Sequence, residues 1–196
     1  MSIMGKGRVE AFSDGVIAII ITIMVLELPV PHSGEPAALV PVLPVFASYA
    51  LSFVLVGIYW NNHHHLLHTV RHVTGGILWS NLHLLFWLSL VPFATAWMGE
   101  NHFGSWTVAL YGTVMLMCGC AYYILTHTII QHHGPESSLL TAVGRDRKGV
   151  ASVALYALAI VLAFANRWVS VALYVTVAVM WLVPDRRIER VIGERV

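Results

Sequence analysis

Apolar residues form six long runs along the chain, and short polar or proline-containing segments separate them. A helix needs about 20 apolar residues to cross a bilayer, so each run predicts a membrane-spanning helix. Pro29 stops the first run and Pro184 stops the last. Polar residues after the second run can extend its helix to His72, and a single Asn-Arg pair between the last two runs predicts a tight helical hairpin. The predicted spans are residues 9–28, 39–61, 75–98, 105–126, 150–165 and 168–183.

The composition agrees with this pattern. Hydrophobic residues make up 58% of the 196 positions, charged residues make up 11%, and the mean hydropathy is +0.74. A soluble domain carries about 25% charged residues, so this chain has too little charge to cover a surface in water. The balance excludes a disordered chain, a nucleic-acid-binding domain and a disulfide scaffold. We expect one all-α membrane domain over residues 1–196, with the lipid bilayer as its surroundings.

Basic residues alternate along the connections between spans. The N-terminus, the segments after the second and fourth spans, and the tail hold ten of them, whereas the other connections hold only Arg167. Lysine and arginine concentrate on the cytoplasmic side, so both termini are predicted to be cytoplasmic in a multi-pass cell-membrane protein. We expect the first run to remain a span and not a cleaved signal, because Glu10 and Asp14 interrupt its basic start. The ten basic residues are Lys6, Arg8, Arg71, Arg145, Arg147, Lys148, Arg186, Arg187, Arg190 and Arg195.

The first span carries unusual polar chemistry for a membrane helix. Asp14 lies about one turn inside it, and Glu10, four residues earlier, occupies the same face. A carboxylate at that depth needs donors from another helix or a watery mouth. The pattern therefore fits a hydrogen-bonded cluster that docks helices together, a cation-attracting or proton-sensing mouth, or both. The candidate partners from the second and third spans are Trp60, Asn61, Asn62, His63, His64, Asn81 and His83.

An apolar stripe follows on the same helix. Ile19, Ile23 and Leu26 are spaced four and three residues apart, and Thr22 adjoins them. A single stripe of this kind is common where a helix packs or faces lipid. If several copies met around an axis, the same stripe would form stacked apolar rings, which can gate ions by dewetting.

The first half of the chain resembles the endolysosomal potassium channel family, transmembrane protein 175. Its first span contains the run Arg-x-x-x-Phe-Ser-Asp at Arg8, Phe12, Ser13 and Asp14, with Thr22 eight residues further on. The second span ends in Tyr-Trp-Asn-Asn-His-His from residue 59, and the third contains Trp-x-Asn-Leu and Leu-x-Pro-Phe-x-Thr. The similarity covers about residues 6–98, and the later spans agree in number and hydropathy.

The resemblance implies a cyclic homotetramer with six helices per chain, in which the first helix of each copy lines a central pore for potassium ions. It implies an apolar constriction at Ile19, Ile23 and Leu26, with Thr22 and Ile19 influencing ion preference. It also implies a network that braces the pore helix against the second and third helices. The network residues are Arg8, Phe12, Ser13, Asp14, Trp60, His63, His64 and Asn81.

Eleven histidines raise the question of a metal or haem. His64, His68 and His72 are spaced four apart, and histidines at that spacing can chelate zinc or copper. No acid or cysteine lies near them in sequence, so we favour a solvated interfacial helix and expect no metal and no cofactor. No nucleophile, base or phosphate-loop pattern predicts an enzyme. The hypothesis is a passive potassium-permeable channel; the alternatives are a secondary cation transporter and a membrane haem or metal protein that uses the histidines.

Overall fold

The computed structural model describes residues 5–70, 72–133 and 147–182, and this part of the chain is all-helical. Four stretches are long and apolar enough to cross a membrane, and two apolar helices are shorter. The expectation of an all-helical membrane protein is therefore confirmed. The elements are α1 (Lys6–Leu26), the 3₁₀ helix η1 (Pro36–Val42), α2 (Leu43–His68), α3 (Gly75–Ser89), α4 (Val91–Glu100), α5 (Ser105–His133), α7 (Arg147–Leu162) and α8 (Arg167–Leu182).

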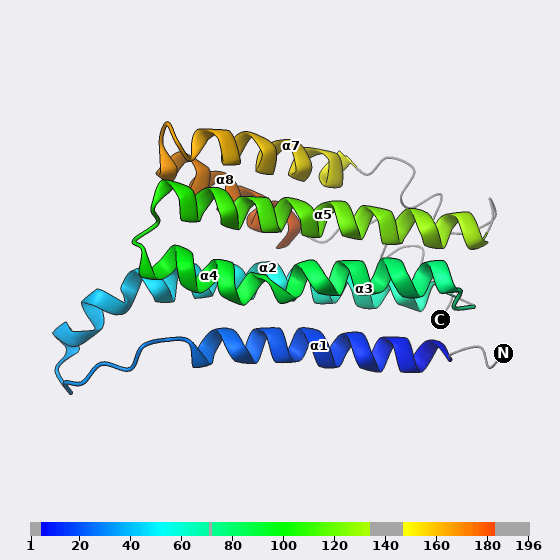
Figure 1. Cartoon of the computed structure of the whole chain (residues 1–196), viewed down its shortest axis with the longest axis horizontal. Helices are drawn as coiled ribbons and strands as arrows, with labels where there is room; N and C mark the ends of the chain where they lie inside the picture. The colour runs from blue at the N-terminus through cyan, green and yellow to red at the C-terminus, as the bar shows by residue number, and fades with distance from the viewer. Residues whose placement is uncertain (1–4, 71, 134–146, 183–196) are drawn as a thin grey trace.

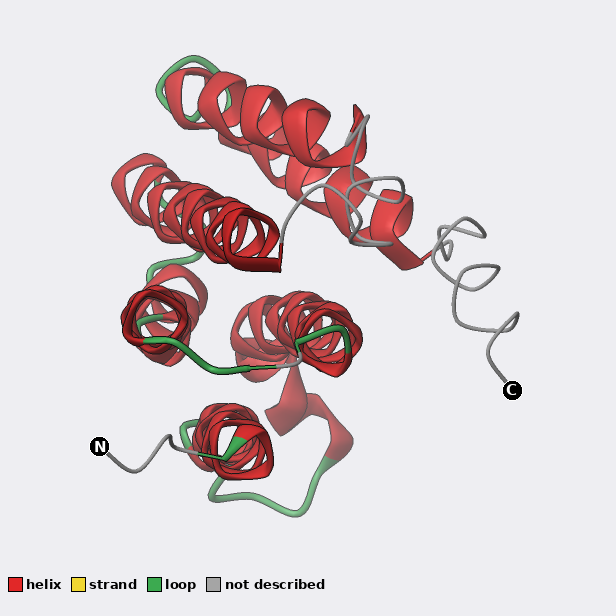
Figure 2. Ribbon diagram, turned by 90° about the vertical axis from the view of Figure 1, so that its right-hand side faces the viewer, coloured by secondary structure: helices red, strands yellow, loops and turns green. Residues whose placement is uncertain are grey.

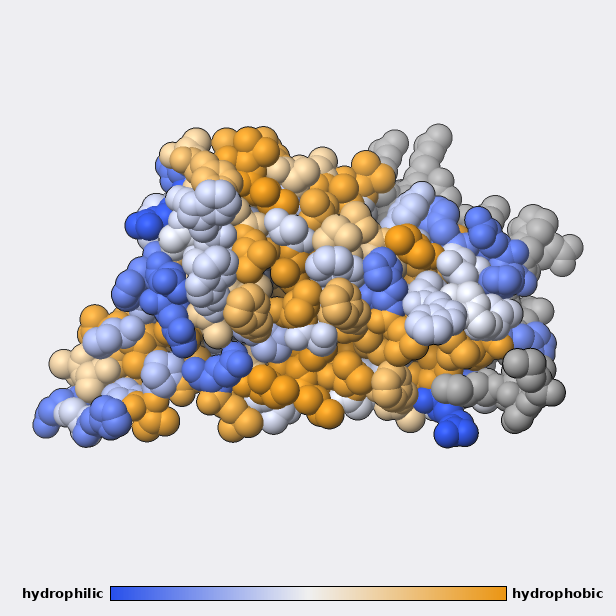
Figure 3. Space-filling model, in the orientation of Figure 1, coloured by the Kyte–Doolittle hydropathy of each residue, from blue (hydrophilic) through white to orange (hydrophobic). Residues whose placement is uncertain are grey.

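The long helices lie side by side along one axis (Figure 1). Helix α1 packs against α2, α3 and α4, whereas α8 packs against α7, α2 and α5. Seen end-on, α1 therefore lies at one edge of the bundle and the α7–α8 hairpin lies at the opposite edge (Figure 2). Apolar side chains dominate the middle of the face in Figure 3, and polar side chains gather towards its two ends. That distribution suits a protein whose middle lies in hydrocarbon.

Proline moves two of the predicted boundaries. The second span was expected from residue 39, but η1 occupies residues 36–42 and the α-helix begins at Leu43, with Pro44 in its first turn. The third span was expected to be continuous over 75–98, but it breaks at Leu90 into α3 and α4. Pro92 has no backbone N–H, and its ring clashes with the carbonyl four residues earlier, so it starts a new helix more readily than it continues one.

Two further helix ends differ from the prediction where the chain is polar. Helix α5 continues to His133, beyond the predicted end at residue 126. Helix α2 ends at His68, so the expectation that its helix continues to His72 is wrong. The backbone N–H groups of Thr69 and Val70 close tight turns onto Leu66 and Leu67, at 3.2 and 3.0 Å, which stops the helix.

Several basic residues of the topology prediction lie outside the described residues, as do the predicted final positions of the last span. These positions are Arg71, Arg145, Val183, Pro184, Arg186, Arg187, Arg190 and Arg195.

Hydroxyl groups join three helices in the middle of the bundle. Ser52 Oγ of α2 lies 2.7 Å from Thr95 Oγ1 of α4 and 3.0 Å from Tyr111 Oη of α5, and all three side chains are buried. Thr95 also donates to its own helix, at the Val91 carbonyl (2.7 Å). Interhelical hydrogen bonds and small residues hold membrane helices together where hydrocarbon gives no hydrophobic driving force. The cluster fixes how α2, α4 and α5 pack, and α1 packs against α2, α3 and α4.

Candidate pore-lining helix

Helix α1 has one buried face and one exposed face. The buried face follows a helical spacing of four, four, three and four residues, and its members are Val9, Ser13, Ile17, Ile20 and Met24. The residues predicted to line a pore lie elsewhere on the helix: Ile19 is 59% exposed, Ile23 41% and Leu26 76%. The single chain therefore leaves the predicted constriction residues outside its own core, where lipid or another copy can contact them.

Thr22 also lies on the exposed face. Its hydroxyl donates to the Ala18 carbonyl of the same helix at 2.8 Å. Because that bond uses the hydroxyl hydrogen, the oxygen lone pairs remain as acceptors on the exposed face. An acceptor among apolar side chains is a suitable contact for a cation that has lost part of its hydration shell.

A buried polar junction holds α1 against α2 and α3. Asn81 Nδ2 of α3 donates to Ser13 Oγ of α1 at 2.9 Å, and His63 Nε2 of α2 lies 2.7 Å from Asn81 Oδ1. Ser13 passes its own hydrogen to the Val9 carbonyl at 2.8 Å. Since Asn81 Oδ1 can only accept, His63 carries a hydrogen on Nε2. The hydrogen bonds therefore run in one direction, from His63 through Asn81 and Ser13 to the Val9 carbonyl. All three side chains are at least 98% buried: Ser13 is 0% exposed, His63 1% and Asn81 2%.

A second, more open contact flanks this junction. Trp60 Nε1 donates to Asp14 Oδ1 at 3.0 Å, so one of the seven candidate partners provides the donor that the carboxylate needs. The Trp60 ring stacks on His64 with centroids 5.9 Å apart, and His64 Nε2 lies 3.1 Å from His68 Nε2. Asp14 is partly exposed, so its charge is accessible at this end of the bundle.

Arg8 and Phe12 do not join this cluster within the chain. Both side chains are exposed, and Phe12 is 53% exposed. The Arg8 side chain makes no hydrogen bond or ion pair with any described residue. Their bracing role therefore remains a prediction, and within one chain the network consists of Ser13, Asp14 and their partners on α2 and α3.

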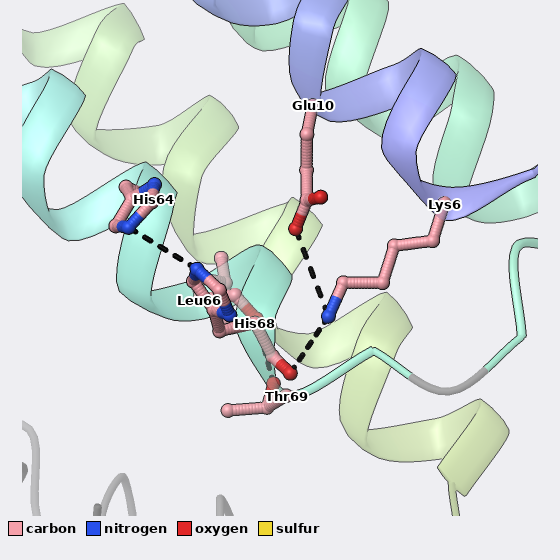
Figure 4. Close-up of polar contacts among 6 residues, drawn as sticks. All are labelled: Lys6, Glu10, His64, Leu66, His68 and Thr69. Carbon is pink, nitrogen blue, oxygen red and sulfur yellow. Dashed lines mark hydrogen bonds and ion pairs between the residues drawn. The ribbon is translucent and has the colours of Figure 1, made fainter.

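Lys6 joins α1 to the end of α2 through a contact that the sequence did not predict. Its Nζ donates to the His68 carbonyl at the end of α2 (2.9 Å) and lies 3.6 Å from Glu10 Oε1 (Figure 4). A lysine at that position satisfies a free carbonyl and favours the negative end of the helix dipole. The four-residue spacing of Lys6 and Glu10 was a visible signal for their pairing, but nothing in the sequence indicated the carbonyl of α2.

No three His, Cys, Asp or Glu residues come together as possible metal ligands among the described positions. His72 lies beyond the end of α2, so it does not extend the His64–His68 pair along the helix. What the geometry provides is an accessible carboxylate at one end of α1 and an uncovered, largely apolar face along the rest. These features define a helical membrane protein in which one helix keeps a face free for contacts beyond its own chain.

Comparison with known proteins identifies the family. Residues 8–92 match the family described as the endosomal/lysosomal potassium channel TMEM175. A potassium channel of Chryseobacterium sp. (strain P1-3) is 52% identical over 191 residues, which cover 97% of this chain and all of that protein. The chain belongs to the TMEM175 family.

More distant relatives are similar over most of this chain. A potassium channel of Chamaesiphon minutus is 30% identical over 88% of this chain and 91% of that protein. The mouse endosomal/lysosomal proton channel TMEM175 is 28% identical over 83% of this chain and 36% of that protein. The crystal structure of a lysosomal potassium-selective channel TMEM175 homologue from Chamaesiphon minutus superposes with a TM-score of 0.79 at 27% identity, covering 90% of this chain and 96% of that one.

Proposed function

We propose that this protein is a potassium-permeable cation channel that conducts passively across the cell membrane as a homotetramer. Helix α1 of each copy lines the central pore, and both termini are cytoplasmic. The observation that carries the proposal is the uncovered face of α1, on which Ile19, Ile23 and Leu26 lie exposed beside Thr22. The relatives named potassium channels support the choice of ion.

Cyclic symmetry between copies of the chain would create the pore. One chain cannot surround an axis with a single helix, but four copies related by cyclic symmetry bring four identical faces together. Ile19, Ile23 and Leu26 then form apolar rings that exclude water when narrow and admit ions when wetted. Thr22 adds hydroxyl oxygens beside those rings, and Asp14 places negative charge at the cytoplasmic entrance, where it raises the local concentration of cations.

The distribution of charge supports the orientation. Lys6, Arg8 and Lys148 lie at the end of the bundle where α1 begins, whereas Glu35 and Glu100 lie at the other end. Cytoplasmic ends of membrane helices carry the excess of lysine and arginine.

The test of the pore is recording from purified protein in a planar bilayer with asymmetric potassium and sodium. We expect unitary potassium currents, and we expect Ile19→Asn to raise conductance and lower the preference for potassium, because four amides would replace four apolar side chains at the constriction. The matched control is Leu158→Asn, which introduces the same group on α7, where Leu158 is 50% exposed. Ile21→Val, a conservative change beside the stripe, should also leave permeation nearly unchanged.

Two results would contradict the proposal. The pore assignment is wrong if Ile19→Asn leaves current and selectivity unchanged while Leu158→Asn alters both. Saturable exchange without unitary currents would indicate a transporter. The assembly is tested separately by mass measurement in detergent, where we expect four copies; monomers alone would count against a pore shared between chains.

A further inference from the structure

A groove of about 550 Å³ lies at the end of the bundle opposite the start of α1. One wall is the first part of α2, including Pro44 and Leu51, and the other is α8, including Val171. The turn between α4 and α5 closes the end of the groove. Its size falls within the range of about 300–1,000 Å³ that is usual for small-molecule sites. Because the walls are apolar, water gains few hydrogen bonds there and an apolar occupant is favoured.

A cation lies at the rim of this groove. Arg167 is the first residue of α8, its side chain is exposed, and its guanidinium carbon lies 5.6 Å from the centroid of the Trp168 ring. In the part of the chain that the structure describes, it is the one Lys or Arg side chain at this end of the bundle and forms no ion pair. An unpaired arginine above an apolar groove presents a planar donor fork, which matches a phosphate group.

Two residues with an unfavourable backbone conformation form the end of the groove. His102 and Phe103 have φ values of 49° and 57°, and they are the only non-glycine residues with positive φ among those described. Such a backbone conformation is unfavourable for a residue with a Cβ and persists only where its surroundings hold it. The Phe103 ring is buried and packs on Trp168 with centroids 5.6 Å apart, while His102 is exposed at the rim. The strained turn therefore places a second hydrogen-bonding group on the same rim as Arg167.

We propose that this groove binds an anionic phospholipid, with its phosphate at Arg167 and His102 and one acyl chain between α2 and α8. The charge of Arg167 favours an anionic head group. The apolar walls favour a ligand with an acyl chain over a free phosphate ion. A second copy of the protein is a poorer occupant, since α8 lies at the edge of the bundle away from α1 (Figure 2). In a tetramer that closes around α1, the edge formed by α7 and α8 faces lipid.

The experiment measures lipid retention and not current, so its outcome is separate from the test of the pore. Delipidated protein in detergent receives equal amounts of phosphatidylglycerol and phosphatidylcholine with identical oleoyl chains, and native mass spectrometry counts each bound lipid. We expect the wild-type protein to retain phosphatidylglycerol preferentially. Arg167→Gln should reduce that preference about fivefold, which is the effect of one basic residue near a lipid surface. Val171→Trp should fill the groove and reduce retention of both lipids.

The matched control is Lys148→Gln at the other end of the same hairpin, where Lys148 Nζ lies 6.0 Å from the centroid of the Trp181 ring. It removes a cation that also lies near a tryptophan ring but is remote from the groove, and it should leave the preference unchanged. The proposal fails if wild-type protein retains both lipids equally, or if Arg167→Gln behaves as wild type. If glycerol phosphate alone displaces the lipid, the site recognises only the phosphate, and the proposed role of the acyl chain is wrong. Loss of copies without loss of lipid in Val171→Trp would make the groove an interface between chains.

Discussion

Replacing Asn81 by alanine tests whether the buried hydrogen bonds of this residue hold α1 against α2 and α3. Asn81 is 2% exposed and is the only link between Ser13 on α1 and His63 on α2 in the hydrogen-bonded chain described above. Asn81→Ala removes two interhelical bonds, each worth about 0.6 kcal/mol in membrane proteins. It also leaves the His63 Nε2 hydrogen buried without an acceptor, at about 1–3 kcal/mol. The free energy of unfolding should therefore fall by about 2–4 kcal/mol.

This loss is large enough to measure in detergent. For a chain of this size, about 2–4 kcal/mol corresponds to a decrease in Tm of about 4–16 °C. Melting can be followed by the fraction of protein that remains monodisperse after heating. Asn101→Ala is the matched control, because Asn101 is exposed and its amide donates only to the Trp97 carbonyl one turn earlier (2.8 Å). That variant should melt within about 2 °C of wild type.

A double-mutant cycle separates the hydrogen bond from other effects. His63→Leu removes the donor that Asn81→Ala leaves unpaired, so the combined variant should lose less stability than the two single variants added together. The coupling should be about 1–3 kcal/mol. Strict additivity, or an Asn81→Ala variant as stable as Asn101→Ala, would refute the reasoning.

The remaining predictions concern two other contacts of the bundle. Asp14→Asn should lower the stability of the proposed tetramer by about 1 kcal/mol, because Trp60 then donates to a neutral oxygen; a variant as heat-resistant as wild type would mean that this bond does not hold α1. Gly99→Ala should cost about 1–3 kcal/mol in a thermal melt, because a Cβ there would lie 2.7 Å from Val45 Cα and push α4 away from α2. Gly57→Ala is its control, since nothing lies within 4 Å of that Cβ, and equal melting of the two glycine variants would contradict the packing argument.

The all-helical character and the order of the apolar segments could be predicted from the sequence because length and hydropathy decide them. The sequence also contains the cause of the break in the third span, because Pro92 is incompatible with a straight helix there. The prediction used Pro92 only as part of the Leu-x-Pro-Phe-x-Thr motif and kept the span continuous. The η1 segment has the same cause in Pro41 and Pro44. Proline chemistry thus accounts for the late start of α2 and for the break in the third span, whereas the end of α2 depends on tight backbone turns at Thr69 and Val70.

The partners of the polar residues could not be predicted in the same way. His63 and His64 follow Trp60 by three and four residues, so both lie on the same side of α2 as Trp60. Each of the three side chains could therefore face Asp14. The rotation of α2 decides between them, and that rotation depends on the packing of α2 against α4 and α8 and on its hydrogen bond to α5. In the structure His63 faces Asn81 and Trp60 faces Asp14, and the sequence carries no local signal for this choice.

The rotation of α1 is decided by polar groups, because apolar residues surround most of the helix. At about 100° per residue, Val9, Ile17, Ile20 and Met24 lie within about 40° of Ser13, and these are its buried positions. On the same scale, Ile19, Thr22 and Leu26 lie about 120° or more from Ser13. The bond from Asn81 to Ser13 therefore sets the direction in which the proposed pore residues point. It follows that Asn81→Ala should change ion selectivity as well as stability, although Asn81 lies on another helix and is buried.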